Sequence, residues 1–143
     1  NDRSGTYSDL SGEGSVVAAR MAVEDFGAAG KGIKVEIVSA DHQNKPDIGS
    51  NLARQGFDSE NVDVIADVPT SSVALAVQEI AREKNKIFLM SGPGSTDLTG
   101  KACSPTGFHW AYDNRALAVG KHSARAIPCS RTRRIRVWRG RRG

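Results

Sequence analysis

The chain has little cysteine, few aromatic residues and no long hydrophobic run. Its 143 residues include two cysteines and 6% aromatic residues, which excludes a small disulfide-rich fold. No apolar run approaches the roughly 20 residues that a membrane-spanning helix needs, and no signal peptide opens the sequence. With 38% hydrophobic and 25% charged residues, the composition is typical of a soluble globular protein, and the length suits one domain with a sizeable core.

Acidic residues are absent from the end of the chain. Residues 121–143 hold eight arginines and one lysine, whereas all 16 acidic residues lie in residues 1–120 beside 11 basic ones. The net charge of +4 therefore averages an acidic body and a strongly basic tail. One interpretation of the tail is an arm that binds nucleic acid or a membrane surface. We favour another, because this mixture of residues without periodicity is typical of a GC-rich gene read out of frame, so residues 121–143 are predicted to be out-of-frame or disordered sequence.

Metal ligands are also scarce. Cys129 lies in the tail, which leaves Cys103 as the one cysteine of residues 1–120. A single cysteine forms no disulfide framework, and no histidine or cysteine lies at metal-ligand spacing from it. We therefore expect neither a disulfide framework nor a metal site.

Helical and strand patterns alternate along residues 1–120. The predicted elements are a helix at 16–26, a strand at 33–40, a helix at 47–59 opened by Pro46, a strand at 62–68 buried on both faces, a helix at 72–84, a strand at 86–90, a strand within 108–112 and a helix from residue 114. This alternation predicts an α/β fold, a doubly wound and mostly parallel sheet with helices on both faces. The opening NDRSGTYSDLSGEGS has no strand before it, although such a loop normally leaves one, so we predict that the first strand is missing.

Three loops rich in Gly, Ser, Thr and Tyr are expected at one edge of this sheet. They are residues 2–15, 69–72 and 91–99. In open α/β sheets, ligands bind beyond the carboxyl ends of the strands, where loops meet helix N-termini. Thr70, Ser71 or Ser72 could cap the following helix, contributing on the order of 1 kcal/mol. Alternatively, a hydroxyl and the free N–H groups could receive a carboxylate from a small ligand, and the residues alone leave both interpretations open.

Motifs for nucleotide binding and catalysis are incomplete. A phosphate-binding loop would need glycine in place of Ser95 and Ser or Thr in place of Ala102. A dinucleotide fingerprint that starts at Gly12 would need glycine in place of Val17. There is no G-x-S-x-G elbow. His109 is predicted to be a structural residue at a strand end, and Asp41 with His42 to form a turn. We therefore predict that the protein is not an enzyme and uses no cofactor.

Several blocks of residues 1–120 agree in order and spacing with one family. They are DRSGTYSDLSGEGSVVAARMAVEDF, VSADHQNKPDIGSNLAR, VDVIADVPTSSVALAVQEIAREKNKIFLMSG and STDLTGKACSPTGFHWAYD. Together they resemble the substrate-binding proteins of ABC transporters, most closely the branched-chain amino acid (Leu/Ile/Val) type with the type I periplasmic binding fold. The resemblance implies that residues 1–120 are an incomplete N-terminal lobe, because the first strand, the sequence after about residue 117 and the second lobe are absent. It further implies a periplasmic protein that closes on an amino acid or small carboxylate and delivers it to an ABC permease in the inner membrane, with no nucleic acid as partner.

The resemblance also implies the residues of the ligand site. In this family a serine hydroxyl and amide groups at the helix after the 62–68 strand hold the ligand carboxylate, which falls on Ser71 and Ser72. The next loop holds the ligand ammonium group with backbone oxygens and a hydroxyl, which falls on Gly92, Gly94, Ser95 and Thr96. Tyr7 is positioned to line the cleft, and Tyr112 is a further candidate.

Three alternatives remain at this point. The first is a ligand-sensing regulatory or receptor domain on the same fold, which an attached helix-turn-helix or membrane segment would favour. The second is an α/β enzyme, which the incomplete catalytic set disfavours. The third is a nucleic-acid binder that uses the basic tail, for which DNA binding should be steeply salt-dependent and should vanish without residues 121–143.

Overall fold

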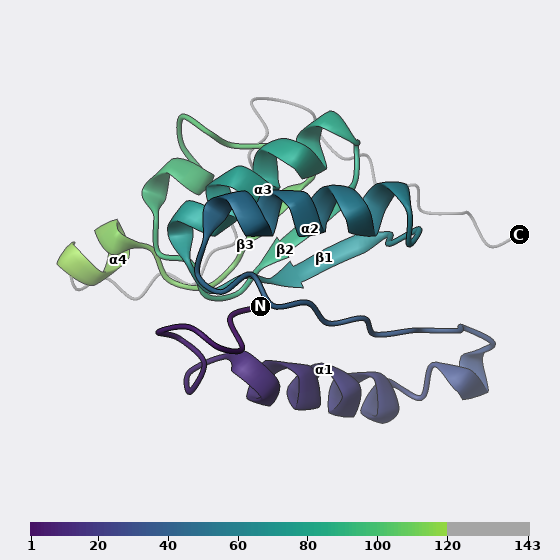
Figure 1. The fold of residues 1–143 in the computed structure, drawn as a ribbon. Coiled ribbons are helices and arrows are strands. Elements are labelled where there is room, and N and C mark those ends of the chain that lie inside the picture. The colour runs from purple at the N-terminus through teal and green to yellow at the C-terminus, as the bar shows by residue number, and fades with distance from the viewer. Residues whose placement is uncertain (120–143) are drawn as a thin grey trace, which may run out of the picture.

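The computed structural model describes residues 1–119. Its centre is a parallel sheet with the strand order β1-β2-β3, made of β1 (Val64–Asp67), β2 (Ile87–Met90) and β3 (Gly107–His109). Helices α2 (Pro46–Asp58) and α3 (Ser71–Glu83) pack against this sheet, whereas α1 (Gly12–Phe26) lies apart from them (Figure 1). The shorter elements are η1 (Ala29–Lys31), η2 (Thr96–Leu98) and α4 (Asn114–Val119). The predicted tail at 121–143 falls outside the described residues.

Local sequence signals set the helix boundaries. Pro46 occupies the first turn of α2, where its fixed φ suits a helix and its missing N–H costs no hydrogen bond. Helix α1 ends at Gly27, which adopts a left-handed conformation (φ 65°) and donates its N–H to the Glu24 carbonyl. The predicted helices are confirmed, although α1 begins four residues earlier than expected. None of the helices within residues 1–119 has the length and apolar character to cross a membrane.

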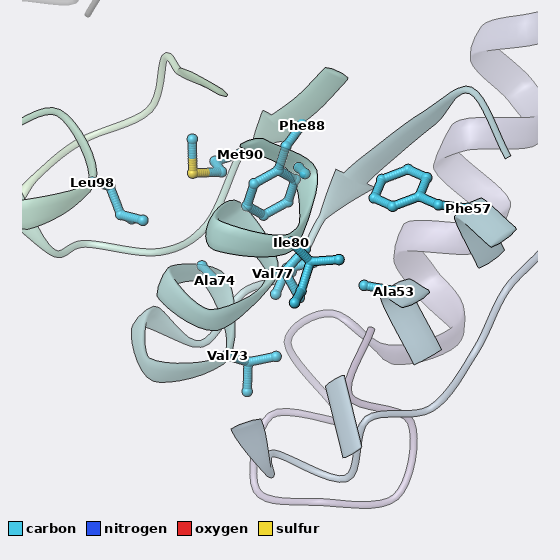
Figure 2. Close-up of a cluster of buried hydrophobic side chains, with 11 residues drawn as sticks. Ala53, Phe57, Val73, Ala74, Val77, Ile80, Phe88, Met90 and Leu98 are labelled. Carbon is cyan, nitrogen blue, oxygen red and sulfur yellow. The ribbon is translucent and has the colours of Figure 1, made fainter. Parts of the chain in front are cut away.

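The hydrophobic core lies between α2, α3 and β2 (Figure 2). Its buried members are Ala53, Phe57, Val68, Val73, Ala74, Val77, Ile80, Ala81, Phe88, Met90 and Leu98. Phe88 on the central strand and Val73 on α3 have no exposed surface. The apolar stripes of the two helices therefore meet over the sheet, and this packing holds α3 and its N-terminus at the carboxyl end of β1.

Gly49 lies where α2 packs tightly against α3. A Cβ added at Gly49 would lie 2.5 Å from Cγ1 of Val73. Alanine in a helix is normally more stable than glycine by about 1 kcal/mol, but here overpacking opposes that gain. We expect Gly49→Ala to lower the free energy of unfolding by about 1–3 kcal/mol, as measured by urea denaturation.

Gly14 provides a matched control for this prediction. It lies in α1, and a Cβ there would meet nothing within 4 Å. Gly14→Ala should therefore raise the free energy of unfolding by up to about 1 kcal/mol. Combining Gly49→Ala with Val73→Ala should give a smaller loss than the two single changes predict, because the clash is removed. Equal gains from Gly14→Ala and Gly49→Ala would contradict the close approach.

The strand predicted at residues 33–40 is wrong. This segment is extended, but it joins no sheet within the part of the chain that the structure describes. Among the described residues, the backbone groups of residues 34–39 have no hydrogen-bond partner. The alternating pattern that predicted the strand is real, but a strand also needs a neighbour to pair with, and β1 does not pair with this segment.

Two further expectations are corrected. The strand predicted at 62–68 is only four residues long, and Val64 is 40% exposed rather than buried on both faces. The reason is that β1 pairs with β2 on one edge and has no strand on its other edge within residues 1–119. In addition, Cys103 is not a free thiol, since no cysteine in the described part of the chain is free, although the sequence predicted no disulfide framework.

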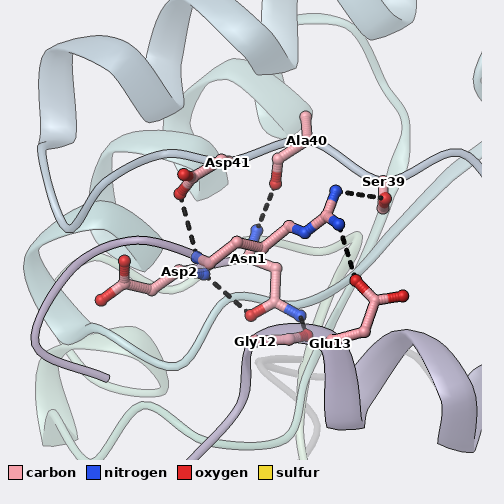
Figure 3. A network of polar contacts seen from close by, with 8 residues as sticks. Asn1, Asp2, Gly12, Glu13, Ser39, Ala40 and Asp41 are labelled. Atoms are coloured by element: carbon pink, nitrogen blue, oxygen red, sulfur yellow. Dashed lines mark hydrogen bonds and ion pairs between the residues drawn. The ribbon is translucent and has the colours of Figure 1, made fainter. Parts of the chain in front are cut away.

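A polar network fixes the first loop against residues 39–42 (Figure 3). Asp2 is fully buried, and its carboxylate accepts from the N–H groups of Gly5 and Tyr7. Asp41 accepts from the Ser4 hydroxyl at 2.6 Å and from the N–H of Arg3 at 3.0 Å. The Ser4 bond, opposed by some desolvation, is the main reason why the pKa of Asp41 falls to about 2. This network places the predicted Asp41–His42 turn beside the amino-terminal residues.

Candidate functional site

Two of the three predicted loops meet at the carboxyl ends of β1 and β2. The Ser71 hydroxyl oxygen accepts hydrogen bonds from the N–H groups of Gly94 at 3.1 Å and Ser95 at 3.2 Å. A Cβ added at Gly92 would lie 3.0 Å from Cα of Pro69, which is tighter than ordinary side-chain contacts. The loop after β2 therefore packs directly on the N-terminus of α3.

Within residues 1–119, no side chain caps the N-terminus of α3, so the capping interpretation is wrong. Thr70 is the N-cap residue, but its side chain makes no cap hydrogen bond. Its Oγ1 atom is buried and has no partner among the described residues, and Ser72 is exposed. The Ser71 oxygen is used by the neighbouring loop, which leaves its O–H proton able to donate. The first N–H groups of a helix have no partner within the helix and carry partial positive charge, so this end of α3 favours an anion.

Tyr112 borders the same loop. The Asn114 N–H donates to the Gly94 carbonyl at 2.8 Å, and a Cβ added at Gly94 would lie 3.5 Å from Cε2 of Tyr112. Tyr112 is 52% exposed. The Tyr112 ring therefore lies beside the loop after β2, and about half of the side chain remains exposed for a further contact.

Ser95 and Thr96 follow in the same loop. The Ser95 hydroxyl accepts from the Asp97 N–H at 3.3 Å and caps η2, whereas Thr96 is exposed. The structure thus brings Ser71, Gly92, Gly94, Ser95 and Tyr112 together. Thr96 and Ser72 flank them along the chain.

Tyr7 lies in a separate loop. Its N–H donates to Asp2 and its carbonyl accepts from the N–H groups of Leu10 and Ser11. The ring is 37% exposed. Within residues 1–119, no hydrogen bond links Tyr7 to Ser71 or to the loop after β2, so its place in the site stays a prediction.

His109 ends β3 and is buried, which confirms the predicted structural position at a strand end, whereas Asp67 at the same edge was not predicted from the sequence. The Ser91 hydroxyl donates to Asp67 Oδ1 at 2.7 Å, while Asp67 Oδ2 and His109 Nε2 are buried without a partner among the described residues. Asp67 and Val68 both have positive φ, 75° and 59°, a conformation that is strained for residues other than glycine and concentrates at functional sites. An acidic residue at the end of an apolar strand is the signal that could have found Asp67. No group of metal-ligating side chains within residues 1–119 is placed to hold an ion.

Comparison with known proteins assigns this arrangement to a family. The family model described as "Periplasmic binding protein" matches residues 1–126, which is most of the chain. The chain belongs to the periplasmic binding protein family. This assignment is to binding proteins rather than to enzymes, and it agrees with the parallel α/β fold and with the resemblance predicted from the sequence.

Solved structures support the assignment. A periplasmic binding protein from Burkholderia mallei is 42% identical with a TM-score of 0.79, over 83% of this chain and 32% of that one. A branched-chain amino acid ABC transporter periplasmic ligand-binding protein from Burkholderia xenovorans is 34% identical with a TM-score of 0.74, over 83% and 34%.

A third match carries a bound ligand. An ABC transporter solute-binding protein from R. palustris, in complex with benzoate, is 26% identical with a TM-score of 0.72, over 83% of this chain and 35% of that one. The chain therefore spans about a third of the length of these periplasmic binding proteins. A search of curated proteins finds no match.

Proposed function

We propose that residues 1–120 form one lobe of a solute-binding protein and contribute half of a site for a small carboxylate, either an amino acid or an aromatic acid. The observation that carries this proposal is the uncapped N-terminus of α3, packed against the loop after β2. There the Ser71 O–H and the first N–H groups of the helix can both donate to a carboxylate. We propose Ser71 and Ser72 for this role.

The loop after β2 would contact the other end of the ligand. Gly92 and Gly94 have no side chain of their own, so their backbone atoms can approach a ligand, and Ser95 and Thr96 add hydroxyls. Tyr7 and Tyr112 would line the cleft, since an aromatic ring gives contact area at little conformational cost. These groups suit the ammonium group of an amino acid or the ring of an aromatic acid.

Two relatives support this ligand class. The Burkholderia xenovorans relative is named for branched-chain amino acids, and the R. palustris relative was solved with benzoate. A carboxylate is common to both kinds of ligand. For the whole protein we propose a periplasmic location and delivery of the solute to an ABC permease, with no nucleic acid as partner.

The proposal is tested by titrating the isotope-labelled chain with branched-chain amino acids and benzoates while its backbone amide signals are followed by NMR. Because one lobe supplies only half of the contacts, we expect weak binding, with Kd about 1–10 mM, a range that corresponds to roughly 3–4 kcal/mol. Amide shifts should concentrate at Ser71, Ser72 and residues 92–96. Ser71→Ala should raise Kd about tenfold or more, because a hydrogen bond to a charged group is lost.

Two variants separate a binding role from a structural one. Ser71→Thr keeps a hydroxyl and should retain most of the binding. Ser50→Ala removes a hydroxyl that donates to the Pro46 carbonyl on α2, and it should leave Kd unchanged. If no carboxylate in the panel shifts the α3 amides, or if Ser71→Ala binds like the unaltered chain, the proposed site is wrong.

A further inference from the structure

His42 is a buried histidine with one ring nitrogen in use. The residue is 2% exposed. Its Nδ1 accepts a hydrogen bond from the Asn44 N–H at 3.1 Å, whereas its Nε2 is buried without a partner among the described residues. A neutral imidazole has one accepting and one donating nitrogen, so Nδ1 is the bare nitrogen and Nε2 carries the proton. The structure therefore holds His42 as one tautomer of the neutral ring.

The bond to Nδ1 closes a tight turn before α2. The Lys45 N–H donates to the His42 carbonyl at 2.8 Å. The two residues between them have positive φ, 52° at Gln43 and 57° at Asn44. Positive φ at both central residues is the pattern of a type I′ turn, and this backbone is unfavourable for residues other than glycine. The His42 ring therefore supports a turn that the backbone alone disfavours.

The surroundings of His42 keep its ring neutral. A Cβ added at Gly49 would lie 3.6 Å from Cβ of His42, so α2 meets the residue with uncharged backbone. Burial is the main reason why the pKa of His42 is lowered, and the positive charge of the Asn1 amino group acts in the same direction. The carboxylates of Asp2 and Asp41 are the leading charges that oppose this shift.

Both carboxylates are already engaged in other hydrogen bonds. Asp2 accepts from two N–H groups of the first loop. Asp41 accepts from two backbone N–H groups and from the Ser4 hydroxyl. A proton added at Nδ1 of His42 would set that nitrogen and the Asn44 N–H against each other as two donors. It would also leave a charge buried without a partner, which is strongly unfavourable.

The same turn holds the first loop in place (Figure 3). The His42 N–H donates to the Asn1 carbonyl at 2.9 Å. Just before it, the Asp41 carboxylate accepts from the N–H of Arg3 and from the Ser4 hydroxyl. All three bonds join the amino-terminal residues to His42 or to its neighbour, so a change in the backbone of this turn moves their partners as well.

We propose that residues 41–45 form an acid-operated switch. Uptake of one proton from water at Nδ1 of His42 breaks its hydrogen bond to Asn44, the turn opens so that the imidazolium reaches solvent, and the first loop separates from residues 39–42. When the pH rises again, the proton leaves and the turn closes. The first loop carries Tyr7, so the effect of this switch on a bound solute rests on the proposed function, whereas the opening itself does not.

The test follows imidazole and amide signals of the complete 143-residue chain by NMR between pH 7.5 and 5. We expect the His42 ring to titrate at a lower pH than the same ring in the urea-unfolded chain. The amides of Arg3, Asn44 and Lys45 should shift with the same midpoint as the ring, because they lose their hydrogen bonds when the turn opens.

The switch also makes stability depend on pH. Because the pKa of His42 is lowered in the folded chain, the unfolded chain binds the proton more readily. Stability is therefore full above the ordinary histidine pKa of about 6.5 and falls as the pH falls through that value. We expect Tm to drop by about 3 °C or more between pH 7.5 and 5.5. His42→Asn keeps an acceptor suited to such a turn but does not titrate, so it should remove most of this drop.

Asn44→Gly is the matched control, because it keeps the N–H and glycine suits the positive φ. This variant should retain the drop in Tm. The proposal is overturned if His42 titrates at the same pH in the folded and unfolded chains, or if the three amides do not follow its midpoint. It is also overturned if the Tm of His42→Asn drops as much as that of the unaltered chain. None of these measurements uses a ligand, so the proposed function is tested separately.

Discussion

Phe88→Ala should lower the free energy of unfolding by about 3–5 kcal/mol, the usual cost of truncating a buried phenylalanine. Phe88 has no exposed surface and lies on the central strand, where it contributes to the cluster formed by α2, α3 and the sheet. Removing its ring leaves a cavity that the flanking helices cannot fill without leaving the sheet. Urea denaturation followed by circular dichroism measures the loss. In a domain of ordinary stability, it would be a large part of the total free energy of unfolding.

Phe108 is the matched control on the neighbouring strand. It belongs to β3, faces Leu89 across the ladder and is 44% exposed. Phe108→Ala should cost less than about 1.5 kcal/mol, because a half-exposed ring loses less burial. Similar losses for the two variants would mean that the core is not centred on β2.

Gln78→Met should lower the free energy of unfolding by about 2–4 kcal/mol, because two backbone carbonyls lose their donor. Gln78 is buried on α3, and its Nε2 donates to the carbonyls of Leu98 at 3.1 Å and Ala102 at 2.5 Å. Methionine has a similar volume and no N–H, so the change removes the hydrogen bonds with little change in packing. The same variant should also speed hydrogen exchange in residues 94–100, since the loop after β2 loses its attachment to α3.

Gln55 is the control for this change. It lies on α2, is exposed, and its Nε2 donates to Glu60. Gln55→Met should change the free energy of unfolding by less than about 0.5 kcal/mol. If Gln78→Met proves as neutral as Gln55→Met, water replaces the lost donor and the loop is not held by this side chain.

The elements with strong local signals were predictable from the sequence. Helices α2 and α3 follow from apolar residues at helical spacing and from Pro46, and β2 follows from a short apolar run. The failures share one cause: residues 33–40 and 62–68 have the patterns of strands, but whether a strand forms depends on a neighbour distant in the chain. Periodicity reports what a segment prefers and carries no information on whether its partner is present.

The candidate site was predictable in part. The hydroxyl-rich loops at strand ends pointed to Ser71 and to the loop from Gly92, and the structure joins these two by hydrogen bonds. The direction of these hydrogen bonds was not predictable, because the Ser71 hydroxyl oxygen accepts from N–H groups of the loop after β2 rather than from N–H groups of its own helix. Asp67 was missed because its left-handed backbone depends on how the chain leaves β1, and no residue type forces that conformation.

The separation of α1 from the core has a consequence for synthesis. All buried members of the core cluster lie between Ala53 and Leu98, so they meet through short loops, which close quickly. The ribosome, however, delivers the amino-terminal part first, at about 5–20 residues per second. Val17, Met21 and Phe26 therefore leave the exit tunnel several seconds before the residues of the core exist. We expect these three side chains to be the part of the nascent chain that chaperones bind, and the last to be covered.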